Sequence, residues 1–268
     1  MTGRRGPDRH ERPPGDGRPC LHPALVWSSS GRRDSNCAGD PSIQLLGGFG
    51  VVARGAIVPL RAPARRVVAY LAVNGDGPHE RGSVSEALWP DRPDDAARTS
   101  LRQAVCSEHR LGAGLIDAGA RHLRLAPGVT VDLHRALAAA DEILSQPADA
   151  GPTVDPSLFL HELLPSWDEE WLILERERFA RLRLACLEEL GRRWLERREW
   201  HLAEAAAAAV AATDPLRESP RMLLARAYIG QGNRVDAIRE YSRYRDHVRD
   251  VLGGEPSPEY RRLIDELR

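Results

Sequence analysis

The amino-acid sequence predicts a mainly α-helical protein with a small β part, divided into two folded domains. Its 268 residues are 42% hydrophobic and 29% charged, a composition typical of a soluble globular chain. Beyond residue 166 the chain carries long helical patterns, in which equivalent residues recur at a fixed offset of 34 positions. Residues 43–125 instead combine short strand patterns with three helical ones. The two halves therefore differ in architecture.

Residues 1–41 are rich in Pro, Gly, Arg, Asp and Ser and show no hydrophobic periodicity. We expect a disordered leader here, or a start codon placed too far upstream. The first residues are basic but no apolar segment comes after them, so we expect no secretory signal. Cys20 and Cys37 lie in this leader, where they could pair or remain free thiols; Cys106 and Cys186 fall in helical patterns.

Residues 42–135 form the first predicted domain. Two apolar pairs flank the tight turn at residues 54–56, which predicts a β-hairpin, and the stretch before them predicts another strand. Three helices are expected next, and Asp94 is the expected N-cap of the third. A small-residue turn at residues 118–120 then joins two short strands. The expected strands cover residues 43–46, 50–52, 57–58, 115–117 and 122–125, and the expected helices 63–73, 81–89 and about 94–111. This order predicts a winged helix-turn-helix.

Residues 136–268 form the second predicted domain. A helix begins at Asp132 just before it, and a polar linker covers residues 147–156. The 34-residue offset relates Trp194 to Tyr228 and Ala203 to Ala237, which is the period of the tetratricopeptide (TPR) helix pair. Stacked pairs of this kind make a docking groove. Two helix starts are also indicated, a capping box at Ser166-x-x-Glu169 and a cap at Ser257-Pro258.

Several motifs in this order resemble one family. Leu45–Phe49, Val84–Pro90, Ala97–Gln103 and Leu123–Ala126 resemble the DNA-binding domain of the actinobacterial antibiotic-regulatory-protein activators (SARP family). Leu163–Trp171, Leu174–Arg178 and Leu252–Glu259 resemble the start and the end of that family's bacterial transcriptional activator domain (BTAD). The resemblance covers about residues 42–268.

This resemblance implies a sequence-specific transcriptional activator that binds direct repeats in double-stranded DNA near promoters, often as a homodimer. It also implies recruitment of RNA polymerase to genes of secondary metabolism, including antibiotic biosynthesis. A cytoplasmic protein without a membrane segment is expected, since no apolar run approaches the ~20 residues of a spanning helix.

The third helix of a helix-turn-helix enters the major groove, so its outward residues are the candidate DNA contacts. Leu101, Ala104 and Val105 form the expected inward stripe of this helix. Outward residues of the helix and residues of the adjoining hairpin are therefore predicted to contact DNA. They are Arg98, Thr99, Arg102, Gln103 and Arg110 on the helix, and Arg121, His122 and Arg124 on the hairpin. Each of them could alternatively be an ordinary solvated residue.

Charge supports DNA binding only modestly. The whole chain carries a net charge of −1, and all 38 of its cationic residues are Arg. Residues 41–135 hold 12 Arg against nine acidic residues, which leaves this domain net positive. Since phosphate attraction depends on local clusters, an excess of this size is compatible with DNA binding.

One residue departs from the family pattern. Glu108 stands where the resemblance predicts a packing leucine, and a carboxylate facing a small core is costly unless it is paired. Either the helix ends early, or the DNA contact is weakened. This departure, together with the small positive excess of the first domain, motivates the alternative function, a TPR-like protein-interaction module whose DNA-binding helix is degenerate.

Other site classes find no support in the sequence. No Ser/His/Asp or Cys/His arrangement has a recognisable catalytic spacing, and no phosphate-binding loop is present. The four cysteines match no zinc framework. We therefore expect neither an enzyme nor a protein that holds a cofactor or a metal.

Overall fold

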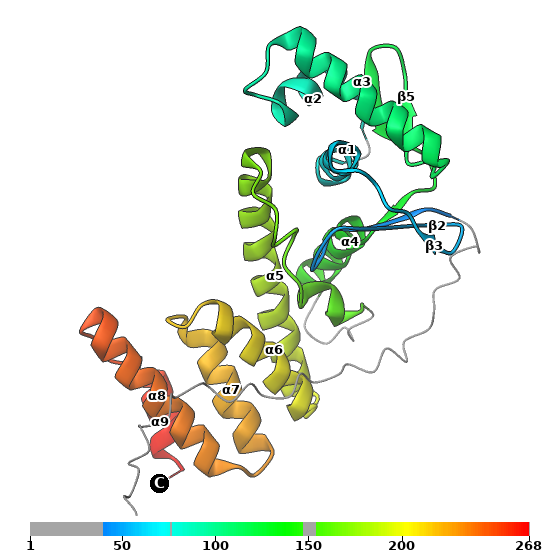
Figure 1. Cartoon of the computed structure of the whole chain (residues 1–268). Helices are drawn as coiled ribbons and strands as arrows, with labels where there is room; N and C mark the ends of the chain where they lie inside the picture. Colours follow the sequence, from blue (N-terminus) through cyan, green and yellow to red (C-terminus); the bar gives the residue numbers. More distant parts are fainter. Residues whose placement is uncertain (1–39, 76, 147–153, 268) are drawn as a thin grey trace, which may run out of the picture.

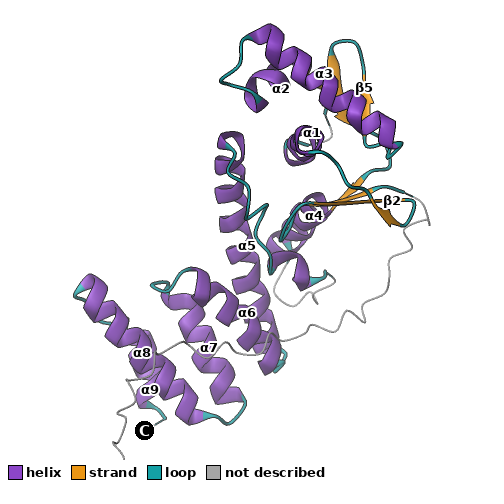
Figure 2. Ribbon diagram, in the orientation of Figure 1, coloured by secondary structure: helices purple, strands orange, loops and turns teal. Residues whose placement is uncertain are grey.

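The computed structural model describes residues 40–75, 77–146 and 154–267. Two small sheets and the first helices occupy the N-terminal half, and an array of helices makes up the C-terminal half (Figures 1 and 2). The predicted fold class, mainly α with a small β part, is therefore confirmed. Residues 1–39 of the predicted leader, with Cys20 and Cys37, lie outside the described residues.

The first sheet contains the predicted N-terminal strands and one strand that the sequence did not indicate. Its order is β3-β2-β1-β7, with β7 parallel to β1 and the other pairs antiparallel. Its strands are β1 Ser42–Gln44, β2 Gly50–Ala53, β3 Ala56–Ile57 and β7 Thr130–Val131. The predicted turn before β3 is confirmed: Arg54 and Gly55 both have positive φ, as a two-residue hairpin turn requires.

Three helices and a second sheet come next. The helices are α1 Ala62–Val73, α2 Arg81–Leu88 and α3 Asp94–Leu111, close to the predicted ranges. The second sheet has the order β4-β6-β5, and its strands are β4 His79–Glu80, β5 Ile116–Ala118 and β6 His122–Leu125. The antiparallel β5–β6 hairpin was predicted, whereas β4 was not. The N-terminal region therefore has the helix-turn-helix and the wing that the sequence predicts.

The helix that comes directly after β7 is hydrogen-bonded to the first sheet. This helix is α4, Asp132–Ser145. The Asp132 carboxylate accepts hydrogen bonds from the backbone N–H groups of Leu45 and Leu46, at 2.8 and 3.0 Å. Burial raises the pKa of this carboxyl, and the backbone hydrogen bonds oppose that rise. α4 therefore continues from β7 and packs beside β1, so the predicted domain boundary at residue 135 falls inside it.

The C-terminal half is a series of helices packed in chain order (Figure 1). After the short 3-10 helix η1, Pro156–Phe159, come α5 Glu170–Glu196, α6 Trp200–Thr213, α7 Glu218–Gly230, α8 Arg234–Leu252 and α9 Pro258–Asp265. The 34-residue offset maps the end of α5 and α6 onto α7 and α8. Ala203 and Ala237, equivalent residues of α6 and α8, are both fully buried. This arrangement confirms the predicted TPR-like architecture.

Two of the three helix starts predicted from capping patterns are wrong. The N-cap position of α3 is Pro93, so Asp94 is already helical and acts on the positive end of the helix dipole instead. α5 begins at Glu170, three residues after the expected start, because Glu169 bonds elsewhere and Ser166 lies in a turn. Only the Ser257 cap is confirmed, since its side chain accepts from the backbone N–H of Tyr260 at 3.2 Å.

The two halves share one hydrophobic core, which runs from Ile43 in the first sheet to Ala227 in α7. The backbone N–H of Leu164 donates to the carbonyl of Leu45, which joins the loop before α5 to the first sheet. Arg193 of α5 is buried, and its guanidinium donates to two carbonyls at the end of α4, at 2.6 and 2.9 Å. The N-terminal region is therefore packed directly against the helical array.

A salt bridge extends this packing to the helix-turn-helix. The Arg66 guanidinium of α1 lies 2.7 Å from the Glu169 carboxylate, just before α5. The same guanidinium donates to the carbonyl of Leu88, the last residue of α2. One side chain thus connects α1, the end of α2 and the start of α5.

Candidate nucleic-acid interface

α3 lies at the outer edge of the molecule, away from α6–α9 (Figures 1 and 2). Its inward face packs on α1 and α2, with Leu101, Ala104 and Val105 buried as predicted. Its outward side chains are exposed. These include the five predicted contacts Arg98, Thr99, Arg102, Gln103 and Arg110. The helix therefore presents the predicted polar face to solvent.

Glu108 is the exception on this helix, because it is fully buried. One of its carboxylate oxygens accepts a hydrogen bond from the backbone N–H of Leu115, at 2.9 Å. The neighbouring His109 ring nitrogen lies 3.2 Å from the carbonyl of Ile116. α3 runs on to Leu111, so Glu108 does not end the helix early. Instead, this carboxylate joins the end of α3 to the segment that enters the β5–β6 hairpin.

The β5–β6 hairpin forms the wing beside α3. Its turn is held to α2, because Arg81 donates from Nε to the carbonyl of Gly119 at 3.0 Å and from its backbone N–H to the carbonyl of Arg121 at 2.9 Å. The wing is therefore fixed on two sides, to the end of α3 through Glu108 and to the start of α2 through Arg81.

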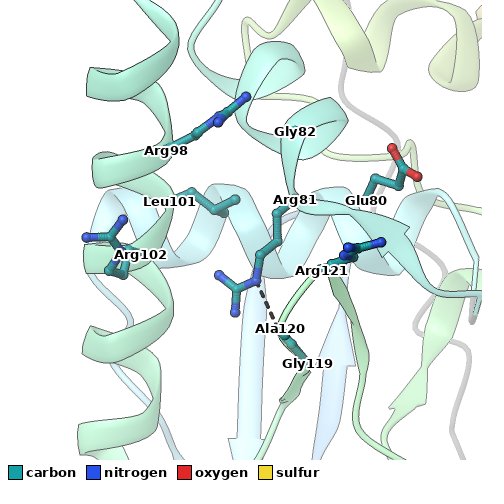
Figure 3. Close-up of a pocket in the computed structure, with 9 residues that line it drawn as sticks. All are labelled: Glu80, Arg81, Gly82, Arg98, Leu101, Arg102, Gly119, Ala120 and Arg121. Atoms are coloured by element: carbon teal, nitrogen blue, oxygen red, sulfur yellow. Dashed lines mark hydrogen bonds between the residues drawn. The ribbon is translucent and has the colours of Figure 1, made fainter.

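A basic hollow with a volume of about 610 Å³ lies between α3, the start of α2 and the wing turn. Figure 3 shows the arginines around it: Arg98 and Arg102 come from α3, Arg81 from α2 and Arg121 from the wing. Glu80 is the one acidic residue among the described residues that line it. Within the described part of the chain, no carboxylate lies within ion-pair distance of these four arginines. The hollow therefore concentrates positive charge at a solvent-facing surface.

Five of the eight predicted contacts do not line this hollow: Thr99, Gln103, Arg110, His122 and Arg124. Arg124 pairs with the Asp117 carboxylate across the hairpin at 2.7 Å, which reduces its free charge. The Thr99 hydroxyl donates to the carbonyl of Asp95 at 2.8 Å, so it can only accept from a ligand while that bond is kept. Arg110 lies on the other flank of α3. His122 is exposed at the start of β6.

Sequence reasoning did not select Arg81. Its position was visible, since it begins the second predicted helix, but nothing in the pattern shows that this helix start meets the wing turn. The contact depends on β4, a two-residue strand that pairs with β6 through His79 and Glu80. A strand of two residues is too short to show an alternation of apolar and polar side chains. Neither β4 nor the contact of Arg81 with the wing turn could therefore be predicted.

Other site types lack structural support in the described residues. No group of three or more His, Cys, Asp or Glu side chains there is placed to hold a metal ion. No helix in residues 40–75, 77–146 and 154–267 is long and apolar enough to cross a membrane.

Comparison with known proteins adds two findings. Residues 157–268 match the family described as "Bacterial transcriptional activator domain". A search of curated proteins finds no significant match.

The fold also resembles a solved structure of Mycobacterium tuberculosis EmbR in complex with a low-affinity phosphopeptide. The TM-score is 0.67 at 23% sequence identity, over 85% of this chain. The chain covers 65% of the length of that EmbR chain. At this identity the likeness establishes a shared fold.

Proposed function

We propose that this chain is a SARP-like transcriptional activator that binds double-stranded DNA sequence-specifically, and the match of residues 157–268 to the bacterial transcriptional activator domain supports the proposal. α3 enters the major groove and the β5–β6 wing lies against the adjacent backbone. The outward side chains of α3 meet base edges, and the wing and α2 hold phosphates.

The basic hollow beside α3 carries this proposal. Arg98 and Arg102 stand one helical turn apart on the same flank, and Arg81 and Arg121 line the same hollow from α2 and the wing. A guanidinium binds a phosphate or the edge of guanine through two parallel hydrogen bonds, so four guanidinium groups without a carboxylate partner around one hollow suit a nucleic-acid strand.

Selection of duplexes from a random library with the full-length protein, followed by anisotropy titrations of the selected site, tests the proposal. We expect the selected duplex to bind at least 100-fold more tightly than a random duplex at 0.15 M salt. Arg98→Ala with Arg102→Ala is expected to weaken binding of the selected site about 10-fold or more, since one good base contact contributes about 1–3 kcal/mol.

A matched pair of substitutions controls for loss of charge. Arg226→Ala with Arg239→Ala removes two exposed arginines from α7 and α8, far from α3. This variant is expected to bind like the wild type. Equal binding of selected and random duplexes by the wild-type protein would contradict the proposed function.

Activation of transcription requires further steps once DNA is bound. We propose that the chain binds promoter-proximal direct repeats as a homodimer, recruits RNA polymerase and activates genes of secondary metabolism. A cytoplasmic location is part of this proposal. In vitro transcription from a promoter that carries the selected site tests recruitment, and analytical ultracentrifugation with and without the duplex tests dimerisation.

The alternative, a protein-interaction module with a degenerate DNA-binding helix, is motivated by Glu108 and by the small positive excess of the N-terminal domain. Because that carboxylate is paired with a backbone N–H and α3 is complete to Leu111, Glu108 does not favour this alternative.

A further inference from the structure

A second hollow, with a volume of about 720 Å³, lies along the other flank of α3. Its walls come from α3, the start of α1 and the turn after α2. Six polar residues line it: Arg61, Arg92, Ser100, Gln103, Ser107 and Arg110. Among the described residues that line it, none is acidic. We call this surface the α1-side hollow. All six of its polar side chains can donate hydrogen bonds.

The positive charge in the α1-side hollow is available to a ligand. Arg61, Arg92 and Arg110 are exposed, and the described part of the chain places no carboxylate within ion-pair distance of them. Arg92 uses one Nη group to donate to the Ser100 hydroxyl at 3.0 Å, which steadies its side chain and leaves its other donors free. α1 begins at Ala62 beside this hollow, and its first turn contains no acidic residue. The positive end of that helix dipole therefore adds to the arginine charge.

The acidic residues close to Arg92 in the sequence lie outside this hollow. Asp91, Asp94 and Asp95 lie around the start of α3, but none of them lines the α1-side hollow. The hollow thus keeps a single sign of charge along its length.

The two hollows lie on opposite flanks of one helix. Successive residues of α3 are about 100° apart around its axis, so Arg98 and Arg102 turn towards the wing while Ser100 and Ser107 turn towards α1. The major groove is about 12 Å wide and an α-helix with its side chains is about 10–12 Å across. A helix in that groove therefore meets a phosphate chain on each flank.

We propose that Arg61 and Arg92 bind backbone phosphates of one DNA strand, opposite the strand that Arg81 and Arg121 contact on the wing side. This inference rests on the proposed function, and it assigns Arg61 and Arg92 of the α1-side hollow to sequence-independent backbone contact. Its substrate class is the phosphodiester backbone of duplex DNA. The contacts of Arg61 and Arg92 set the position of α3 in the groove and carry no base preference.

The salt dependence of DNA binding tests the proposal. Anisotropy titrations of the full-length protein are made between about 0.05 and 0.3 M salt, with a random duplex of about 30 base pairs and with the duplex selected by the wild type. Each phosphate contact adds about 0.9 to the slope of log affinity against log salt. Arg61→Ala with Arg92→Ala is therefore expected to lower the slope by about 2 on both duplexes. A slope of about 0.9 per contact corresponds to a factor of about eight in affinity between 1 M and 0.1 M salt. Each lost contact is therefore expected to weaken binding about eightfold at about 0.1 M salt.

Two control variants accompany the double Ala variant. Arg61→Lys with Arg92→Lys keeps the charge and is expected to keep most of the slope. Arg226→Ala with Arg239→Ala removes two distant exposed arginines and is expected to leave the slope unchanged. The ratio of selected to random affinity should be the same in all these variants, because a phosphate contact does not distinguish bases. Thermal unfolding confirms that each variant is folded.

The outcomes separate the two proposals. A wild type that binds the selected duplex specifically, with an unchanged slope in the double Ala variant, overturns the assignment of Arg61 and Arg92 and leaves the proposed function standing. A wild type that shows no specific binding overturns both. Loss of transcription activation with unaltered DNA affinity would instead assign the hollow to an acidic surface of a protein partner, and this also overturns the inference.

Discussion

Replacement of Glu108 by Leu tests whether the buried carboxylate stabilises the contact between α3 and the wing or destabilises the recognition helix. In the structure it accepts the backbone N–H of Leu115 at 2.9 Å, in fully buried surroundings. Leu restores the residue that the family resemblance predicts, but it removes the acceptor for that N–H. A buried donor left without a partner costs about 1–3 kcal/mol.

Two effects of the Leu substitution oppose each other. The other oxygen of Glu108 is buried without a hydrogen bond, so removal of the carboxylate also relieves a desolvation cost. We therefore expect Glu108→Leu to lower the free energy of unfolding by about 1–2 kcal/mol, near the lower end of that range. For a folded region of this size the corresponding fall in Tm is about 2–8 °C. Glu108→Gln keeps an acceptor for Leu115 and should lose less stability than Glu108→Leu.

Denaturant unfolding supplies the stability values, and amide hydrogen exchange gives a local readout. The Leu115 amide should exchange faster in Glu108→Leu, because its bond is lost, and at the wild-type rate in Glu108→Gln. Cys106→Ser, an exposed change on the same helix, is the matched control. A Leu variant at least as stable as the wild type, with the Leu115 amide equally protected, would show that the Glu108–Leu115 hydrogen bond does not stabilise the protein.

Three further predictions concern the helical array. Gly230→Ala should lower the free energy of unfolding by about 1–3 kcal/mol in denaturant titrations, because an added Cβ would lie 2.6 Å from the Trp200 ring; a neutral effect would show that this ring moves aside freely. Burial raises the pKa of the Cys186 thiol to about 12, so at pH ~8 a thiol reagent should modify exposed Cys106 and leave Cys186 intact until the protein is unfolded. Mass mapping of the native protein measures this, and equal modification of the two cysteines would contradict the prediction. Arg193→Met should cost about 2–4 kcal/mol, since it leaves two carbonyls at the end of α4 without their donor; a Met variant that melts at the wild-type temperature would contradict that contribution.

Sequence patterns predicted the elements whose signal is long or repeated. α3 was predicted by an apolar stripe along its length, and the α5–α8 array by its 34-residue repeat, which needs no knowledge of contacts. Of the two-residue strands, β3 was predicted from the turn before it, whereas β4 and β7 carry no long or repeated signal and were missed.

Partners across long sequence distances were also beyond prediction. Glu169 resembles the end of a capping box, yet it bonds Arg66, 103 positions earlier, because packing brings α1 against the start of α5. For the candidate site, the exposure of Arg98, Arg102 and Arg110 followed from helical spacing alone. The position of Arg81 beside the wing turn and the partner of Glu108 depend on tertiary packing, which spacing does not encode.

The continuous core between the first sheet and α7 has a consequence for promoter geometry. Because the two halves are packed together instead of being joined by a free tether, the groove-reading helix and the C-terminal array keep a fixed angular relation. Once α3 sits on DNA as proposed, that array projects from one side of the duplex, and a duplex turns once in about 10.5 base pairs. Activation should therefore be periodic in the distance between operator and promoter: about five inserted base pairs turn the array to the far side, and about ten bring it back.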